Sequence, residues 1–184
     1  MKAKNRVLNR YSVFDLVIIA LVSALGIATK PIIVPLIHII TGPLFIPGGA
    51  VAGGFYMLWI VLGAGLVKKK GTGTLIGIVQ SILVIATGAM GTHGIMSIIS
   101  YTLPGIAVDL IFMISSGKNY NILHYVFGCM LANICGTLVA NILFFRLPLV
   151  TVIFVCSSAA LSGAIGGLIA YSINKTLDKI NIVL

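Results

Sequence analysis

Six apolar stretches fill most of this 184-residue chain, and each is close to the roughly 20 residues that a helix needs to cross a bilayer. They span about residues 12–29, 48–67, 72–90, 94–115, 121–144 and 149–173. Apart from the apolar segment 30–47, their connections are short, so almost no residues remain for a soluble domain. The pattern predicts an all-α membrane protein, a bundle of six transmembrane helices that forms a single integral membrane domain over residues 1–184.

The composition agrees with a chain that is dissolved mainly in lipid. Hydrophobic residues make up 59% of the sequence and charged residues 8%, there is no Glu, and the mean hydropathy is +1.18. Gly, which lets helices approach closely in lipid, occurs 21 times. The three cysteines fall inside predicted spans without metal-ligand spacing, so we expect packing roles for them and no metal or cofactor.

The positive charges lie almost entirely on one side of the predicted membrane. Ten of the twelve basic residues fall before the first span, in the turn after the second, after the fourth and after the sixth, and only Lys30 and Arg146 fall on the other side. The positive-inside rule therefore places both termini in the cytoplasm. This distribution argues against a nucleic-acid partner despite the net charge of +9, and five later spans favour an uncleaved first helix over a signal peptide.

The segment between the first two spans, residues 30–47, holds four of the six prolines and is otherwise apolar. Proline removes a backbone donor and breaks helices, so we expect an irregular segment here, a Pro-rich outer loop that covers the bundle. The expectation is a lid over a binding site, with His38 and Thr41 facing the ligand. The alternative is a short re-entrant segment that only seals the bundle.

Polar residues inside the spans form two stripes. Asn133, Thr137 and Asn141 recur at helical spacing in the fifth span, and a second stripe begins at His93 and continues into the fourth span. Its members are His93, Ser97, Ser100, Tyr101 and Pro104. Both stripes open to the outer side, which favours a pocket between them, whereas for any single residue a hydrogen bond between helices explains the polarity equally well.

Four further residues call for an interpretation. Gln80 lies near the middle of the third span, and Tyr56 and Trp59 lie in the outer half of the second, where they either anchor the helix at the interface or stack on a flat ligand. Asp109, in the fourth span, is either protonated or paired with a basic group such as Lys68, Lys69 or Lys70. The predicted ligand-binding residues are thus His38, Tyr56, Trp59, Gln80, His93, Ser97, Tyr101, Asn133 and Asn141.

No motif indicates catalysis, because the chain lacks a phosphate-binding loop, a zinc-binding HExxH pair and a Ser/His/Asp set. We therefore expect a protein that is not an enzyme. The first span carries Ala20, Ala24 and Ala28 at four-residue spacing, which lets another helix approach closely and predicts a face that docks on a partner. Ala159, Gly163 and Gly167 form a similar row in the last span, either for docking or for internal packing.

The whole chain resembles the substrate-binding S components of energy-coupling factor (ECF) vitamin transporters. The resemblance rests on the length, the six predicted spans, the long first loop and the Ala20/Ala24/Ala28 spacing. Residues 54–59, 68–71 and 73–88 look most like the type assigned to hydroxymethylpyrimidine or thiamine. That type carries acidic residues on its third and fourth helices, whereas this chain has Gln80 on the third, which does not favour a cationic thiazolium ligand.

The resemblance implies a subunit in the plasma membrane of a prokaryote that binds a vitamin or vitamin precursor, with a thiamine-related compound favoured. It further implies that an ECF transmembrane coupling protein and two ATPase subunits drive uptake. Two other functions remain open on the residues alone. One is a structural or assembly subunit of a membrane complex without a small ligand, and the other is a self-sufficient secondary transporter.

Overall fold

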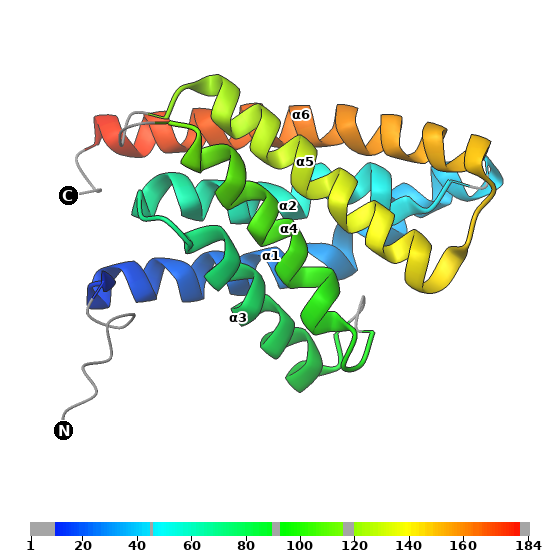
Figure 1. Ribbon diagram of the computed structural model, residues 1–184, viewed down its shortest axis with the longest axis horizontal. Helices are drawn as coiled ribbons and strands as arrows, with labels where there is room; N and C mark the ends of the chain where they lie inside the picture. The colour runs from blue at the N-terminus through cyan, green and yellow to red at the C-terminus, as the bar shows by residue number, and fades with distance from the viewer. Residues whose placement is uncertain (1–9, 45, 90–92, 116–119, 181–184) are drawn as a thin grey trace.

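The computed structural model describes residues 10–44, 46–89, 93–115 and 120–180, and within them all regular structure is helical (Figure 1). The long helices are α1 (Val13–Thr41), α2 (Gly48–Val67), α3 (Thr72–Thr87), α4 (Ser97–Met113), α5 (Ile122–Ala140) and α6 (Leu149–Lys179). A 3₁₀ turn, η2 (Gly42–Leu44), follows α1, and a π-helical turn, η3 (Asn141–Phe145), ends α5. The predicted all-α class is confirmed.

Five helical segments are long and apolar enough to cross a membrane when the turn before α4 is counted with it as Gly94–Met113 and η3 is counted with α5 as Ile122–Phe145; α3 is the exception. It has 16 residues and ends before Gly88, whose φ of 61° stops the helix. At 1.5 Å per residue, α3 is about 24 Å long, less than the roughly 30 Å of a hydrocarbon core. The predicted span 72–90 is therefore a shorter helix, whereas the last span is longer than predicted and continues to Lys179.

The predicted irregular segment 30–47 is wrong over most of its length, because α1 continues as a helix through Pro31 and Pro35 to Thr41. Of the described residues in this segment, only 42–44, 46 and 47 lie outside the α-helices. Each proline removes one backbone hydrogen bond, but a membrane helix tolerates this loss where a neighbouring helix packs on it. Here α2 begins directly against α1: a side chain at Gly48 would lie only 3.0 Å from the Cα and N of His38.

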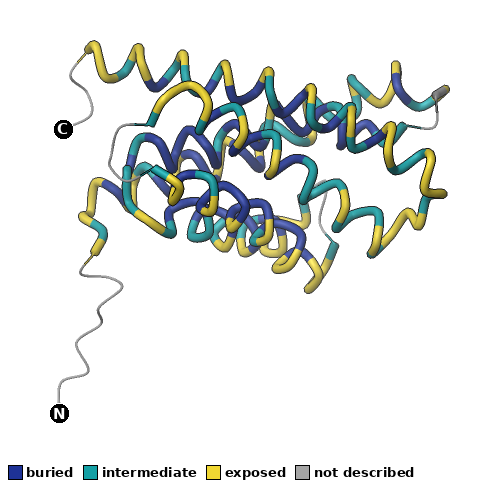
Figure 2. Tube along the Cα trace, turned by 45° about the horizontal axis from the view of Figure 1, so that its top comes forward, coloured by how far each residue is buried: buried dark blue, intermediate teal, exposed yellow. Residues whose placement is uncertain are grey.

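The core of the bundle is built around α2, which packs against each of the other five long helices. Figure 2 shows the buried residues gathered in the middle of the bundle and the exposed ones along its outside. Glycines on α2 and α6 allow this close packing, since a Cβ at Gly54 would lie 1.9 Å from the carbonyl oxygen of Ser162. Gly163 and Gly167 face α5 in the same way, so the row in the last helix serves internal packing.

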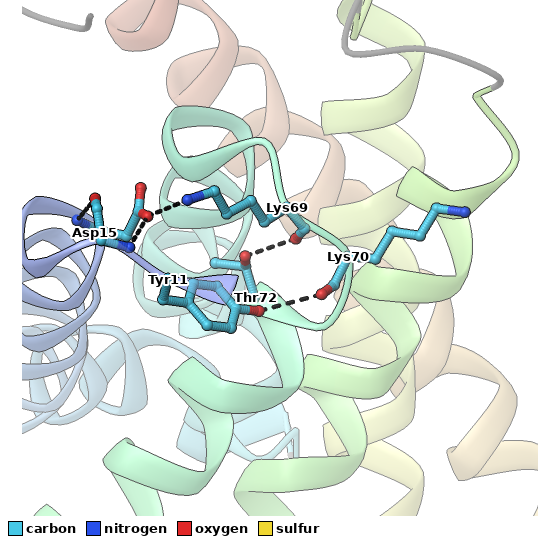
Figure 3. Close-up of polar contacts among 6 residues, drawn as sticks. Tyr11, Asp15, Lys69, Lys70 and Thr72 are labelled. Carbon is cyan, nitrogen blue, oxygen red and sulfur yellow. Dashed lines mark hydrogen bonds and ion pairs between the residues drawn. The ribbon is translucent and has the colours of Figure 1, made fainter. Parts of the chain in front are cut away.

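The start of α1, the α2–α3 turn and the end of α6 meet at one end of the bundle, which we call the charged end (Figure 1). Asp15 pairs with Lys69, and Asp178 lies 3.5 Å from Lys68. Figure 3 shows the Asp15–Lys69 pair and, beside it, the Tyr11 hydroxyl donating to the carbonyl of Lys70. These contacts connect the start of α1 and the end of α6 to the α2–α3 turn.

Asp109 has hydrogen-bond partners that the sequence does not predict. Its carboxylate accepts hydrogen bonds from the backbone N–H of Gly73 (2.9 Å) and of Thr74 (2.8 Å), and from the Thr74 hydroxyl (2.6 Å). These groups form the N-terminus of α3, where free N–H groups and the helix dipole favour an anion. Among the described residues no ion pair joins Asp109 to Lys68, Lys69 or Lys70, so the alternative of a lysine partner is wrong: Lys68 and Lys69 pair with Asp178 and Asp15, and the partners of Asp109 are donors of α3.

Candidate functional site

A cavity of about 360 Å³ lies at the end of the bundle opposite the charged end, where α2 begins and α5 turns into α6 (Figure 1). A volume of this size is typical of sites for small organic ligands. Its wall is mostly apolar, with polar groups contributed by separate helices. The polar and aromatic lining residues are Lys30, His38, Tyr56, His93, Ser100, Tyr101, Thr137, Asn141 and Phe145.

Lys30, on α1, places its ammonium between two tyrosines of the wall. Its Nζ donates a hydrogen bond to the Tyr101 hydroxyl at 2.8 Å. The same nitrogen lies 4.2 Å from the ring centroid of Tyr101 and 4.6 Å from that of Tyr56. Tyr56 is held in turn by its hydroxyl, which donates to the carbonyl of Gly49 at 2.7 Å. Two aromatic faces at these distances favour a positive charge at this point of the cavity.

His93, which precedes α4, is positioned by the first turn of that helix. Its backbone N–H donates to the Ser97 hydroxyl at 2.8 Å, its Nδ1 lies 3.2 Å from the Ser100 hydroxyl, and its ring packs 4.3 Å from that of Phe144. Burial and the positive charge of Lys30 hold the pKa of His93 below its usual value. The neutral imidazole can therefore offer or accept a hydrogen bond at the wall.

Five of the nine predicted ligand-binding residues line this cavity: His38, Tyr56, His93, Tyr101 and Asn141. They come from four different parts of the chain, as the two polar stripes and the first connection predict. Asn141 also stabilises the α5–α6 connection, because its Oδ1 accepts the backbone N–H of Leu147 at 2.9 Å.

The other four, Trp59, Gln80, Ser97 and Asn133, lie outside the lining and connect helices or turns. Asn133, 1% exposed, donates both amide hydrogens, to the carbonyls of Ala50 (2.9 Å) and Ala159 (2.8 Å), and so joins α5 to α2 and α6. Trp59 donates its indole N–H to the Thr29 hydroxyl at 3.0 Å, which joins α2 to α1.

The two remaining residues of this group have similar roles. Gln80 packs on α1, where a Cβ at Gly26 would lie 2.3 Å from its Nε2. Ser97 accepts the backbone N–H of His93.

Lys30 is the residue of the cavity that sequence reasoning missed. It was assigned only to the outer side of the membrane, next to a segment expected to be irregular. The available signal was its isolation, because it is one of two basic residues on that side and lies within an apolar run. Its position inside a helix turns the side chain toward α2 and α4, whereas the predicted loop over residues 30–47 fixes no direction for this side chain.

The predicted docking face on α1 is open. Ala20, Ala24 and Ala28 are all exposed, and Leu21 and Leu25 extend the same apolar surface. The opposite side of the helix is buried against α2 and α3 through Ile19, Ser23 and neighbouring residues. Nothing in the described chain covers the alanine row.

Comparisons with known proteins agree with this architecture. The chain superposes with a TM-score of 0.78 on a solved structure described as the crystal structure of an S-component of an ECF transporter, which is 16% identical. The alignment covers 94% of this chain and 88% of that one, and it confirms the predicted S-component fold. No curated protein matches the chain in sequence.

A family model gives a sequence-level relationship. The model for the permease component of an ABC-type cobalt transport system matches residues 14–135, which are 122 of the 184 residues and include the helices that form most of the cavity and the alanine face. The chain therefore belongs to the family of permease components of ABC-type cobalt transport systems.

Proposed function

We propose that this protein is the substrate-capture (S) subunit of an ECF-type importer, and that it binds a vitamin or vitamin precursor in the cavity that contains Lys30. The observation that carries the proposal is this cavity. It lies at one end of a bundle with an S-component fold, and separate helices contribute polar groups to its wall. A subunit that served only to hold other proteins together would have no need for such a site. Membership in a transporter family supports the same function.

In this proposal the charged end faces the cytoplasm and the cavity faces outward. Ten of the twelve basic residues lie on the cytoplasmic side in the proposed topology, in agreement with the positive-inside rule. The shorter helix α3 then completes six crossings, since a bilayer can thin locally around a helix that is a few ångströms short.

Energy for transport comes from partner proteins in this proposal. The chain has no phosphate-binding loop of its own, so two ATPase subunits and a transmembrane coupling protein supply hydrolysis and movement. The coupling protein docks on the exposed face of α1 that includes Ala20, Ala24 and Ala28. The loaded subunit then tilts in the membrane and releases its cargo inside.

Among vitamins, thiamine-related compounds are favoured by the resemblance of the sequence to S components of that type. The properties of the cavity favour some of these compounds over others. Its volume of about 360 Å³ and its tyrosine rings suit one substituted heteroaromatic ring. The lining includes Lys30 but no carboxylate. A cationic thiazolium would have no counter-charge there, whereas a hydroxymethylpyrimidine or its phosphate ester has no cationic ring and meets no such penalty.

The family description names cobalt, so a cobalt ion is the second candidate substrate. His38 and His93 both line the cavity and offer imidazole ligands of the type that such metals prefer. In the described residues, however, no three His, Cys, Asp or Glu side chains come together as a metal site. The donor set thus favours an organic molecule over a bare ion.

The test is thermal unfolding of the detergent-purified protein with a panel of water-soluble vitamins, their precursors and Co²⁺. A ligand at about 100 times its Kd stabilises the native state by about 2.7 kcal/mol. A saturable shift with one organic compound supports the proposal, and a shift with Co²⁺ alone favours the family description. A folded, ligand-free sample that responds to nothing on the panel indicates an assembly subunit instead.

The docking step has its own test, Ala24→Trp. A bulky ring on the alanine row is expected to abolish co-purification of the coupling protein and uptake, while ligand binding stays unchanged. Ala86→Trp, on the exposed side of α3, is the matched control for an added ring on the lipid-facing surface. Uptake that persists in Ala24→Trp would remove the docking assignment. Transport by the purified chain in liposomes without partners would identify a secondary transporter.

A further inference from the structure

The ammonium of Lys30 is a positive charge inside the bundle for which the chain provides no acidic side chain. The whole sequence contains three acidic residues, Asp15, Asp109 and Asp178. Each has other partners: Asp15 pairs with Lys69, Asp178 with Lys68, and Asp109 binds the N-terminus of α3. All three belong to the half of the bundle away from the cavity.

Helix geometry shows how far these carboxylates are from the cavity. Asp15 precedes Lys30 by 15 residues on α1, which is about 22 Å at 1.5 Å per residue. Asp109 follows Tyr101, the hydrogen-bond partner of Lys30, by eight residues on α4, or about 12 Å. Asp178 lies 23 residues beyond Val155, the last lining residue of α6, or about 34 Å. None of them is close enough to neutralise Lys30.

The groups that surround the ammonium orient it without neutralising it. Within the described chain it makes one hydrogen bond, to the Tyr101 hydroxyl, although an ammonium has three N–H donors. The rings of Tyr56 and Tyr101 lie within 4.6 Å of Nζ and favour the charged form. A charge in a membrane domain is costly, and it is usually kept where it contacts a substrate or a counter-charge.

We infer that the transported molecule carries an anionic group, a carboxylate or a phosphate monoester, that binds the ammonium of Lys30 inside the cavity. The inference rests on the proposed function and adds to it the chemical class of the cargo. The anion completes a site in which the protein supplies the positive charge and the tyrosine rings, and the ligand supplies the negative charge. A ring attached to the anionic group fits the apolar remainder of the wall, where Val34, Met57 and Phe145 lie.

The experiment compares pairs of small heteroaromatic compounds with the same ring, of which one member carries an anionic group and the other does not, with the detergent-purified full-length protein. The pairs are nicotinate with nicotinamide, pyridoxine phosphate with pyridoxine, and hydroxymethylpyrimidine phosphate with hydroxymethylpyrimidine. Affinity is measured by calorimetry and by thermal shift. The anionic member of at least one pair is expected to bind at least about 10-fold more tightly, as a charge-assisted hydrogen bond provides. The nicotinate pair tests a carboxylate and the other two test a phosphate.

Substitution of the lysine then links the selectivity to this residue. Lys30→Met is expected to lower the affinity for the anionic compound by about 10- to 100-fold and to change the affinity for its neutral counterpart by no more than a few-fold. Lys30→Arg is expected to keep the preference for the anionic compound. Lys70→Met is the matched control, because Lys70 is exposed at the charged end. If Lys30→Met does not fold, the preference of the wild-type protein and of Lys30→Arg within the pairs decides the question.

The outcomes separate this inference from the proposed function. Neutral members that bind as tightly as the anionic ones, or a Lys30→Met protein with unchanged affinity for the anionic compound, overturn the inference and leave vitamin capture intact. A folded protein that binds neither member of any pair, nor any other vitamin of the panel, overturns the capture function, and the inference with it.

Discussion

Replacing Asp109 separates a structural role from a transport role for this buried acid. The carboxylate is 7% exposed and accepts three hydrogen bonds from Gly73 and Thr74 at the start of α3. A hydrogen bond to a charged group contributes about 1.5–3 kcal/mol, and the desolvation of the carboxylate offsets part of that sum. We therefore expect Asp109→Ala to lower the free energy of unfolding by about 3 kcal/mol, and Asp109→Asn, which keeps one acceptor, by about 1–2 kcal/mol.

The assay is equilibrium unfolding in mixed micelles of a mild detergent and sodium dodecyl sulfate, followed by far-ultraviolet circular dichroism. Asp178→Asn is the control, because the Asp178 side chain is 43% exposed and its partner Lys68, 3.5 Å away, is 30% exposed, and such surface pairs contribute about 0–1 kcal/mol. Ligand affinity is measured on the same samples. Full stability in Asp109→Ala together with lost ligand binding or uptake would refute the capping role and indicate that Asp109 takes part in transport.

Three further predictions concern packing, a polar link and a titrating wall residue. Gly54→Ala should destabilise the fold by about 1–3 kcal/mol, because its Cβ would lie 1.9 Å from a carbonyl oxygen of α6. Gly49→Ala is the control: the nearest atom to its Cβ would be 3.8 Å away, so the free energy of unfolding should stay nearly unchanged in the same assay. Asn133→Ala should cost about 1–3 kcal/mol through two lost interhelical hydrogen bonds and leave ligand affinity unchanged; a large loss of affinity at full stability would contradict that assignment. The imidazole of His93 should titrate below 6.5 in NMR spectra, so its contribution to the stability of the fold decreases as the pH falls below 6.5. Lys30→Met should raise the pKa of His93, because it removes a neighbouring positive charge. An unchanged pKa in that variant would exclude the coupling.

Hydropathy and spacing predicted the parts of this protein that depend on local sequence. The apolar stretches located all six helices, because the backbone of a chain in lipid satisfies its hydrogen bonds within each helix. The alanine row on α1 was recognised from its four-residue spacing, and the structure leaves it exposed. The two polar stripes contributed His93, Tyr101 and Asn141 to the cavity wall.

The prolines and Asp109 show where local rules fail. Pro31 and Pro35 predict an interruption, yet α1 continues, since α2 packs against its second half and offsets the lost backbone bonds. For Asp109 the sequence offers a proton or a lysine partner, yet its donors are Gly73 and Thr74 in the first turn of α3, 36 and 35 residues earlier in the chain. In both cases the local structure depends on contact with a helix that lies outside the stretch of sequence around the residue.

The sequence by itself determined that this chain is a helical membrane protein with a small-residue face on its first helix, and it predicts most of the basic residues on one side of the membrane. Those properties follow from composition and helical periodicity, which are local. Only the tertiary structure decided which polar residues share a cavity, because that depends on how each helix is rotated about its axis when it packs. Asn133 and Thr137 lie one turn apart on α5, yet the first joins three helices and the second lines the cavity. In the sequence Lys30 only helps to assign the side of the membrane. In the structure it becomes the charged group of the site, because the packing of α1 on α2 places its side chain between Tyr56 of α2 and Tyr101 of α4.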